Sequence, residues 1–305
     1  MRLEPVVVVM DEMIEEDLCG HYEISDEQVA QVDRDGFLRL PGVLDPATLG
    51  TVVSSVHHAT AHSPQLARPR RERSAYEMAF VQEMNLWQRY EEIRPLVYSP
   101  KLARIAAELL GVDGVRLYHD QALVKEAHGG KTPWHCDQYY WPLDTDRTLT
   151  AWIPLDDVPL EQGPLAFAKG SHRVDVGREL DISEASEQKI IAHDAWQEFE
   201  LDEAPFRAGD ISVHLGWTFH GARPNNTDSE RSVFTIIYVA DGTPLAEPVT
   251  QGQLDDREKW LPDSRIGEPI DSWLNPLLWH RDGSHVGALE RAVPIAKRMG
   301  TIVLD

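Results

Sequence analysis

From Val115 onward the chain is a succession of short apolar or alternating runs separated by Gly, Pro, Asn and Asp. Such runs are typical of β-strands, because successive side chains of a strand point to opposite faces and turn residues end it. The clearest runs are residues 116–125, 148–153, 210–214 and 232–239. Many short strands in succession predict a β-barrel or a β-sandwich.

Segments ahead of these strands carry the start and stop signals of amphipathic helices. Ser25 offers an N-cap, Asp45-Pro46 opens a run to about Thr60, and Ser99-Pro100 opens a run that Gly111 ends. A further helix is predicted over residues 183–196, between two strands. The tail after Pro244 has no clear periodicity, so we predict no element there.

The chain has no internal repeat, low-complexity tract or Gly/Ser linker that would separate domains. Hydrophobic residues make up 42% and charged residues 26%, a balance that allows a large core. We therefore expect a single domain over residues 1–305. Its expected parts are a helical N-terminal part at about 1–112, a β core at about 113–242 and a C-terminal extension at about 243–305.

The net charge limits the kinds of partner that we expect, and the cysteine content indicates the cellular compartment. Lys and Arg total 29 against 51 Asp and Glu, a net charge of −22, which repels nucleic acid and anionic membranes. The early apolar run 6–10 is too short for a signal core or a membrane span. With only Cys19 and Cys136 there is no disulfide framework, so we expect a cytoplasmic protein.

Two histidines and one aspartate form a candidate metal site. His135 and Asp137 lie two residues apart in a strand-like stretch, so both side chains should point the same way and Cys136 the other way. His220, after a later strand, offers a third ligand. Two imidazoles and one carboxylate suit iron(II) and leave coordination positions open, although a tetrahedral zinc hydrolase site is the competing interpretation.

A His-x-Asp tripeptide alone is weak evidence, because such tripeptides also occur in ordinary turns. Arg231 strengthens the hypothesis, since it follows His220 by eleven residues on the next strand-like run. A guanidinium there could hold a carboxylate through two parallel hydrogen bonds. His214 could replace His220 as a ligand, but the turn and the spacing to Arg231 favour His220, and we interpret His214 as an ordinary barrel histidine.

These residues together resemble the signature of the phytanoyl-CoA dioxygenase family of iron(II)- and 2-oxoglutarate-dependent oxygenases. The stretch 35–44 is similar to the family's opening strand, and Gly163-Pro164-Leu165 with Gly170-Ser171-His172 resembles its mid-barrel turn. The resemblance covers roughly residues 30–240. It implies a mainly β fold with flanking helices around a double-stranded β-helix, a jelly-roll core.

The resemblance also implies the cofactors iron(II), 2-oxoglutarate and O2. His135, Asp137 and His220 would hold the metal, Arg231 would hold the distal carboxylate of 2-oxoglutarate, and Gln121 and Trp152 match positions that contact this co-substrate. The family often has Ser two residues after the distal His, where this chain has Ala222. Gln82 or Lys125 could supply the missing hydrogen bond.

Family members that halogenate lack the metal carboxylate, so Asp137 favours hydroxylation of a small molecule with release of succinate and CO2. Desaturation, epimerisation, cyclisation and a carrier-bound substrate remain open, as does an iron-binding jelly-roll protein without turnover. For the substrate pocket we predict Trp141, Tyr139 and Asn85. The basic cluster of Arg68, Arg70, Arg71 and Arg73 is interpreted as a solvated loop, with anion docking as the alternative.

Overall fold

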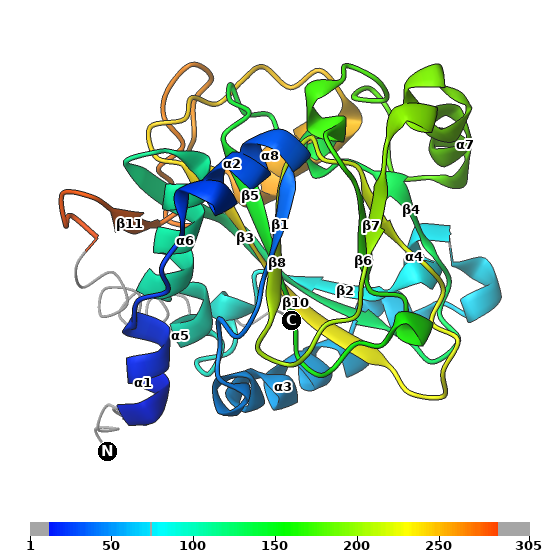
Figure 1. Cartoon of the computed structure of the whole chain (residues 1–305), viewed down its shortest axis with the longest axis horizontal. Helices are drawn as coiled ribbons and strands as arrows, with labels where there is room; N and C mark the ends of the chain where they lie inside the picture. Colours follow the sequence, from blue (N-terminus) through cyan, green and yellow to red (C-terminus); the bar gives the residue numbers. More distant parts are fainter. Residues whose placement is uncertain (1–11, 74, 286–305) are drawn as a thin grey trace.

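The computed structural model describes residues 12–73 and 75–285, in which two antiparallel β-sheets face each other (Figure 1). The strands are short, as their turn-rich sequence predicts, except for β3 and β10. Their bounds are β1 Phe37–Leu40, β2 Val81–Met84, β3 Gly114–Lys125, β4 Thr132–His135, β5 Thr148–Pro154, β6 Leu165–Ala168, β7 Leu201–Glu203, β8 Ile211–Leu215, β9 His220–Ala222, β10 Arg231–Ala240 and β11 Leu277–His280.

Within the described part of the chain, the larger sheet runs β1-β8-β5-β10-β3-β11, with β2 also paired to β3, and the smaller sheet runs β4-β9-β6-β7. Strands distant in sequence are neighbours in both sheets. This two-sheet arrangement of antiparallel strands with flanking helices is the predicted jelly-roll, so the fold class is confirmed.

Helices surround the two sheets. Their bounds are α1 Glu12–Cys19, α2 Asp26–Asp35, α3 Pro46–Ala61, α4 Ala75–Ala79, α5 Arg94–Val97, α6 Pro100–Leu110, α7 Glu184–Ala192 and α8 Gln251–Trp260. Helices α3 and α6 cover the outer face of the larger sheet, α7 packs on β4 of the smaller sheet, and α8 packs on the turn after Asp137. One apolar cluster joins Val56 of α3 and Ile105 of α6 to Leu117 of β3 and Ile236 of β10. Burial of this shared face is what holds the helical layer on the sheet.

Strand β10 is buried along its whole length because both of its faces are covered. Phe234 and Tyr238 belong to the cluster under the helices, whereas Arg231 and Thr235, on the opposite face, line a cavity between the sheets. Because strand side chains point alternately to opposite faces, successive residues of β10 face the apolar core and the cavity in turn.

The predicted helix signals act as expected. Ser25 caps α2 through a capping box with Gln28, Asp45 accepts a hydrogen bond from the Ala47 amide at the start of α3, and Ser99 caps α6. Gly111 ends α6 in the left-handed conformation. These helix predictions are confirmed.

Several elements were not predicted. Strands β1 and β2 lie within the part expected to be helical and join the larger sheet, although the resemblance had indicated β1. Helix α8 and strand β11 come from the tail, and β11 pairs with β3. Helix α8 escaped prediction because its sequence, Gln251–Trp260, has almost no apolar periodicity.

Between residues 12 and 285, apart from residue 74, the structure contains no helix with both the length and the apolar character needed to cross a bilayer.

Candidate active site

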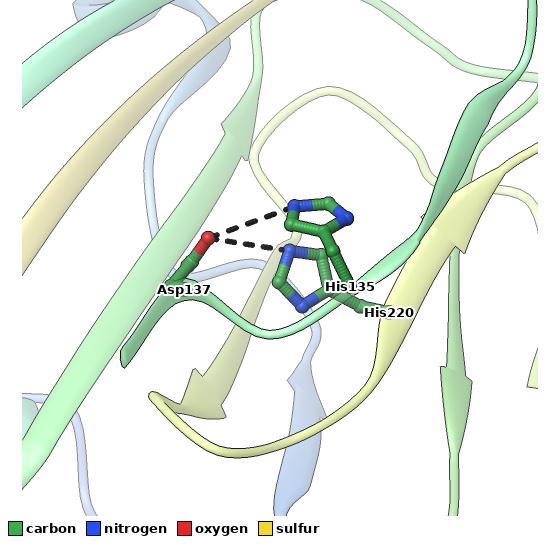
Figure 2. A group of neighbouring side chains, drawn as sticks. All are labelled: His135, Asp137 and His220. Atoms are coloured by element: carbon green, nitrogen blue, oxygen red, sulfur yellow. Dashed lines mark ion pairs between the residues drawn. The ribbon is translucent and has the colours of Figure 1, made fainter. Parts of the chain in front are cut away.

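The three predicted metal ligands converge at one end of the smaller sheet (Figure 2). Strand β4 ends at His135, which lies opposite His220, the first residue of β9. Asp137 begins the 3-10 turn that follows β4, and extended backbone at Cys136 keeps its carboxylate on the same side as His135. Cys136 is buried against Phe219 in a separate apolar cluster, as the alternation of strand side chains predicts.

The geometry fits one metal ion. The Nε2 atoms of His135 and His220 lie 3.7 and 3.6 Å from Oδ1 of Asp137, and the three ligand atoms are all within 4.8 Å of one another. Nδ1 of His135 lies 2.7 Å from the Pro133 carbonyl, and Nδ1 of His220 lies 3.0 Å from the Thr218 carbonyl. These bonds place the ring proton on Nδ1 and leave each Nε2 lone pair free for a metal.

Electrostatics favours an ionised carboxylate beside two neutral imidazoles. Burial by itself would raise the pKa of Asp137, but His220, His214 and His135 around it outweigh burial and lower that pKa. Burial lowers the pKa values of His135 and His220. Neutral imidazoles with one carboxylate form the ligand set that non-haem iron(II) oxygenases use.

His214 does more than pack the barrel. Its Nε2 lies 3.1 Å from Oδ2 of Asp137, and the Thr150 hydroxyl donates to the same oxygen at 3.0 Å. The interpretation of His214 as an ordinary barrel histidine is therefore corrected: it orients the metal carboxylate while His220 supplies the ligand. Sequence reasoning missed Thr150, although its place in a strand that crosses the cavity was predictable.

The turn before His220 is held in place by two neighbouring segments. The Ser171 hydroxyl accepts from the Phe219 amide at 2.8 Å, and the Thr218 hydroxyl donates to the Gly36 carbonyl at 2.7 Å. Gly36 has φ 84°, and a Cβ atom there would lie 2.5 Å from both His172 and Thr218. Only glycine permits this close approach without rearrangement.

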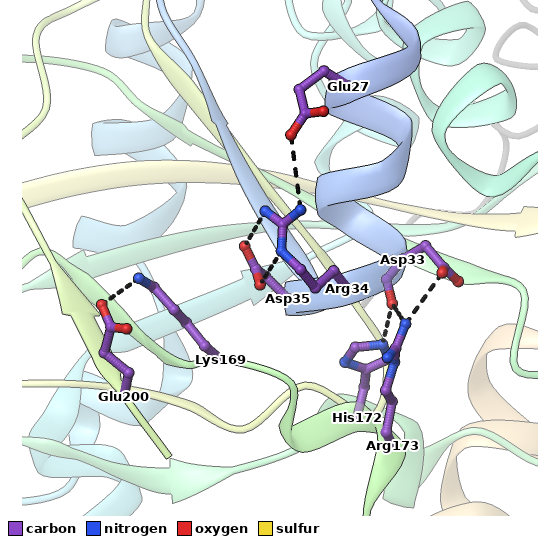
Figure 3. A network of polar contacts seen from close by, with 8 residues as sticks. All are labelled: Glu27, Asp33, Arg34, Asp35, Lys169, His172, Arg173 and Glu200. Carbon is purple, nitrogen blue, oxygen red and sulfur yellow. Dashed lines mark hydrogen bonds and ion pairs between the residues drawn. The ribbon is translucent and has the colours of Figure 1, made fainter. Parts of the chain in front are cut away.

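A polar network secures the Gly-Ser-His turn that carries Ser171 (Figure 3). His172 Nε2 lies 3.1 Å from the Asp33 carbonyl, and Arg173 forms an ion pair with the Asp33 carboxylate at 3.1 Å. Beside them, Lys169 pairs with Glu200. Helix α2, which contains Asp33, is thereby tied to the turn that fixes His220.

A cavity of about 320 Å³ opens beside the ligands, with Arg231 in its wall. Arg231 is buried, its Nη1 donates to the Gly163 carbonyl at 2.5 Å, and its guanidinium carbon lies 5.4 Å from the Trp152 ring centre. Its Nε has no hydrogen-bond partner among the described residues. A buried guanidinium with a spare donor is suited to a carboxylate ligand.

Gln121, Thr235 and Trp152 form one row across three strands, because Thr235 of β10 lies opposite both of the others. All three line the cavity, so the structure brings the two residues predicted to contact the co-substrate together beside Arg231. Among the residues that the structure describes, the buried Thr235 hydroxyl has no hydrogen-bond partner. Thr235 was missed, yet it lies four residues after Arg231 on the same face of β10, a signal in the sequence.

A second buried cation lies next to Arg231. Lys125 is opposite Arg231 across β3 and β10, and burial, with Arg231 adding to it, lowers the Lys125 pKa to about 6. Burial lowers the pKa of Arg231 to about 10. In the described ranges neither residue forms an ion pair with a carboxylate. A buried guanidinium and a buried amine, neither of them paired with a carboxylate, indicate a site for an anionic ligand.

A threonine hydroxyl lies beside Ala222, where the family often has a serine. Thr132 lies opposite Ala222 in the β4-β9 ladder, and both line the cavity. The Lys125 ammonium lies 3.4 Å from the Thr132 hydroxyl, and Gln82 donates to Gln121 at 2.6 Å. A hydroxyl is thus retained at this position by Thr132.

The predicted substrate residues are only partly brought together. Trp141 lines the cavity, and so does its neighbour Tyr140. Tyr139 packs in an apolar cluster instead, and Asn85 is buried in a turn with φ 50°, so neither belongs to the lining. The 3-10 turn after Asp137 explains the position of Tyr139, because it rotates successive side chains differently from a strand, whereas Asn85 lies in another turn, directly after β2. A substrate-binding role for either residue stays a prediction.

The basic cluster does not offer free cations where the structure describes it. Arg68 pairs with Glu77, Arg71 lies 3.4 Å from Glu72, and Arg73 lies 2.9 Å from Glu126. This intramolecular pairing argues against anion docking, and Arg68 and Arg71 are exposed as the solvated-loop interpretation requires, whereas the Arg73 side chain is buried.

Comparison with known proteins gives one family. A sequence model of phytanoyl-CoA dioxygenase (PhyH) matches residues 32–233, more than half of the chain. A probable alpha-ketoglutarate-dependent hypophosphite dioxygenase of Stutzerimonas stutzeri is 29% identical over 163 residues, which are 51% of this chain and 56% of that protein. The chain spans about half the length of the curated relatives that it matches first.

Two solved structures share the fold over nearly their whole length. The epimerase SnoN of nogalamycin biosynthesis, in complex with Fe3+, alpha ketoglutarate and nogalamycin RO, is 26% identical with a TM-score of 0.69, covering 83% of this chain and 98% of that one. The carbocyclase SnoK from the same biosynthesis is 26% identical with a TM-score of 0.69, covering 85% and 99%.

Proposed function

Because the chain belongs to the phytanoyl-CoA dioxygenase family, we propose that it is an iron(II)- and 2-oxoglutarate-dependent dioxygenase that oxidises a small molecule. The observation that carries the proposal is the convergence of His135, Asp137 and His220 within reach of one ion, beside a cavity with Arg231 in its wall. Bound iron would supply the oxidation chemistry, coupling the conversion of 2-oxoglutarate and O2 to succinate and CO2 with oxidation of the substrate.

The side chains of this protein would have separate tasks. The two Nε2 atoms and the Asp137 carboxylate hold the metal, and His214 and Thr150 keep that carboxylate in position. Arg231, with Lys125 behind it, balances the charge of the distal carboxylate, while Gln121 and Trp152 flank the co-substrate. Trp141 and Tyr140 exclude water on the substrate side of the metal.

Hydroxylation is the outcome that we propose first, because Asp137 occupies the position at which a halogenase would need an open site for chloride. Epimerisation or cyclisation is the second candidate, and the likeness to SnoN and SnoK favours it. Both outcomes need the same cofactors and the same residues.

The test begins with purified protein under anaerobic conditions. Addition of iron(II) and 2-oxoglutarate should produce a weak visible charge-transfer band, and exposure to O2 should release succinate. Absence of this charge-transfer band, whichever of iron(II) and 2-oxoglutarate is added first, would contradict the proposal. Succinate release that no small molecule accelerates, across amino acids, acyl thioesters and polyketide or terpenoid intermediates, would instead indicate an iron-binding protein without a substrate.

Product analysis separates the two outcomes once a substrate is found. With labelled dioxygen, a hydroxylase places one labelled oxygen atom in its product. An epimerase or cyclase yields product without the label.

A further inference from the structure

One face of strand β3 runs past both ends of the cavity. Lys125 lies beside Arg231 at one end, Gln121 follows, and His119 lies six residues before Lys125, which is roughly 20 Å along an extended strand. Gln121 and His119 both line the cavity. The cavity therefore has a cationic end at Arg231 and a second end at His119, on the far side of Gln121.

The second end carries an acidic side chain, Asp256 of α8. Asp256 lines the cavity, and the Tyr118 hydroxyl donates to its Oδ2 at 3.0 Å. Burial raises the pKa of Asp256 to about 7, against the opposing effects of Tyr118 and Lys259. Over the described residues, no Lys, Arg or His nitrogen lies within ion-pair distance of Asp256, so this largely enclosed carboxylate lacks a cation.

Aromatic side chains surround this end. The Trp141 ring lies 5.4 Å from Tyr118, and the Trp260 ring lies 5.8 Å from His119. His119 is almost fully buried, and its Nδ1 has no hydrogen-bond partner in the described part of the protein. Aromatic walls around a carboxylate favour cationic ligands, because the ring faces carry negative charge density.

Helix α8 is firmly placed over the turn that follows Asp137. A Cβ atom on Gly252 would lie 3.0 Å from the Tyr140 ring, and Gln253 Nε2 donates to the Tyr139 carbonyl at 3.2 Å. This close packing fixes Asp256 relative to the metal ligands. The Tyr118 hydroxyl, which donates to this carboxylate, holds it in place in turn.

We propose that Asp256 binds a protonated amine of the substrate, so that this enzyme acts on a small molecule with a basic nitrogen. The inference rests on the proposed oxygenase function and adds the substrate class. A substrate of this kind would lie between the metal and α8, with its ammonium group on Asp256 and its carbon skeleton against Trp141. A small anion would be repelled by the ionised form of Asp256 at this end of the cavity.

The test compares amines with neutral molecules of the same shape. Protein loaded with iron(II) and 2-oxoglutarate under anaerobic conditions is titrated with benzylamine, cyclohexylmethylamine and phenethylamine, each against the matching alcohol, at pH 8. Binding is followed by calorimetry and by perturbation of the charge-transfer band. We expect at least one amine to bind at least tenfold more tightly than its alcohol.

The variant Asp256→Asn keeps the shape of the side chain and removes its charge. We expect it to abolish the preference for amines while the dissociation constant for 2-oxoglutarate stays unchanged. Asp255→Asn removes the same charge one residue earlier on α8, outside the cavity lining, and should keep the preference. Thermal unfolding and 2-oxoglutarate binding establish that both variants are folded.

Each outcome decides a different question. A wild-type protein without amine preference overturns the inference, and so does a preference that survives in Asp256→Asn. Loss of 2-oxoglutarate binding in Asp256→Asn would show that this carboxylate is structural and would also overturn it. Absence of the charge-transfer band in every variant would contradict the proposed function, which is a separate result.

Discussion

The two ends of the cavity are built in different ways. The end at Arg231 is made from neighbouring strands of the larger sheet, with Gln121, Thr235 and Trp152 fixed in one row by β-ladder register. The end at Asp256 depends on α8, a helix from the tail that packs on the turn after Asp137. We propose that the sheet holds the co-substrate, while α8, which lies after the residues 32–233 that the family model matches, shapes the substrate end.

Loss of the metal site, which serves both ends of the cavity, should have the largest effect on activity. Asp137→Ala removes the carboxylate of the metal site, and we expect iron-dependent succinate formation to fall to background. Thermal unfolding should change little, because Asp137 contributes to the metal site and not to an apolar cluster. Succinate formation at the wild-type rate would remove Asp137 from the metal site. The matched variant Asp144→Ala, in a nearby loop outside the cavity lining, should retain activity.

A change at the cationic end should leave the other end intact. Arg231→Gln removes a charge-assisted pair of hydrogen bonds, so we expect the dissociation constant for 2-oxoglutarate to rise roughly a hundredfold. Amine binding should be unaffected when 2-oxoglutarate is present at saturating concentration.

The control for this change is Arg39→Gln, which removes an arginine from the same sheet. Arg39 pairs with Asp202 at 2.9 Å and is absent from the cavity lining, so 2-oxoglutarate binding should stay at the wild-type level. Equal weakening in both variants would mean that general charge, and not the position of Arg231, determines affinity.

A larger side chain under α8 should disturb only the end of the cavity at Asp256. In Gly252→Val the added side chain meets the Tyr140 ring, and overpacking of this kind costs about 1–3 kcal/mol. We expect amine probes to bind roughly tenfold more weakly, with 2-oxoglutarate affinity unchanged. Gly252→Ala, with a single added methyl group, should give a smaller effect in the same titration. A parallel loss of 2-oxoglutarate binding would show that the two ends are not independent.

The last prediction concerns the uptake of a proton when 2-oxoglutarate binds. Because burial lowers the pKa of Lys125 to about 6, its amine is neutral in the free protein above that pH. The arriving dianion favours the ammonium form, so 2-oxoglutarate binding should take up a proton and weaken as pH rises above about 6, by at most about tenfold per pH unit. Calorimetry in buffers of different ionisation enthalpy measures this uptake.

Lys125→Met retains the length and apolar stem of the side chain and should abolish the proton uptake. If this variant takes up the same number of protons on binding 2-oxoglutarate as the wild type, a group other than Lys125 is responsible for the uptake.

The sequence alone determined the parts of this protein that depend on local chemistry. Ser25, Asp45 and Ser99 mark helix starts because a side-chain oxygen can bond free amides within the same turn. His135, Asp137, His220 and Arg231 could be found because their spacing, together with the family resemblance, carries the signal. The alternation of strand residues correctly turned Cys136 away from the metal.

Only the tertiary structure decided which distant residues meet. The pairing of β4 with β9 brings the Thr132 hydroxyl beside Ala222, and His214 of β8 contacts Asp137 directly. Asp256 enters the site on a helix whose sequence has no apolar pattern. Such contacts depend on ladder register and on helix docking between segments far apart in the chain, and no short sequence pattern specifies either.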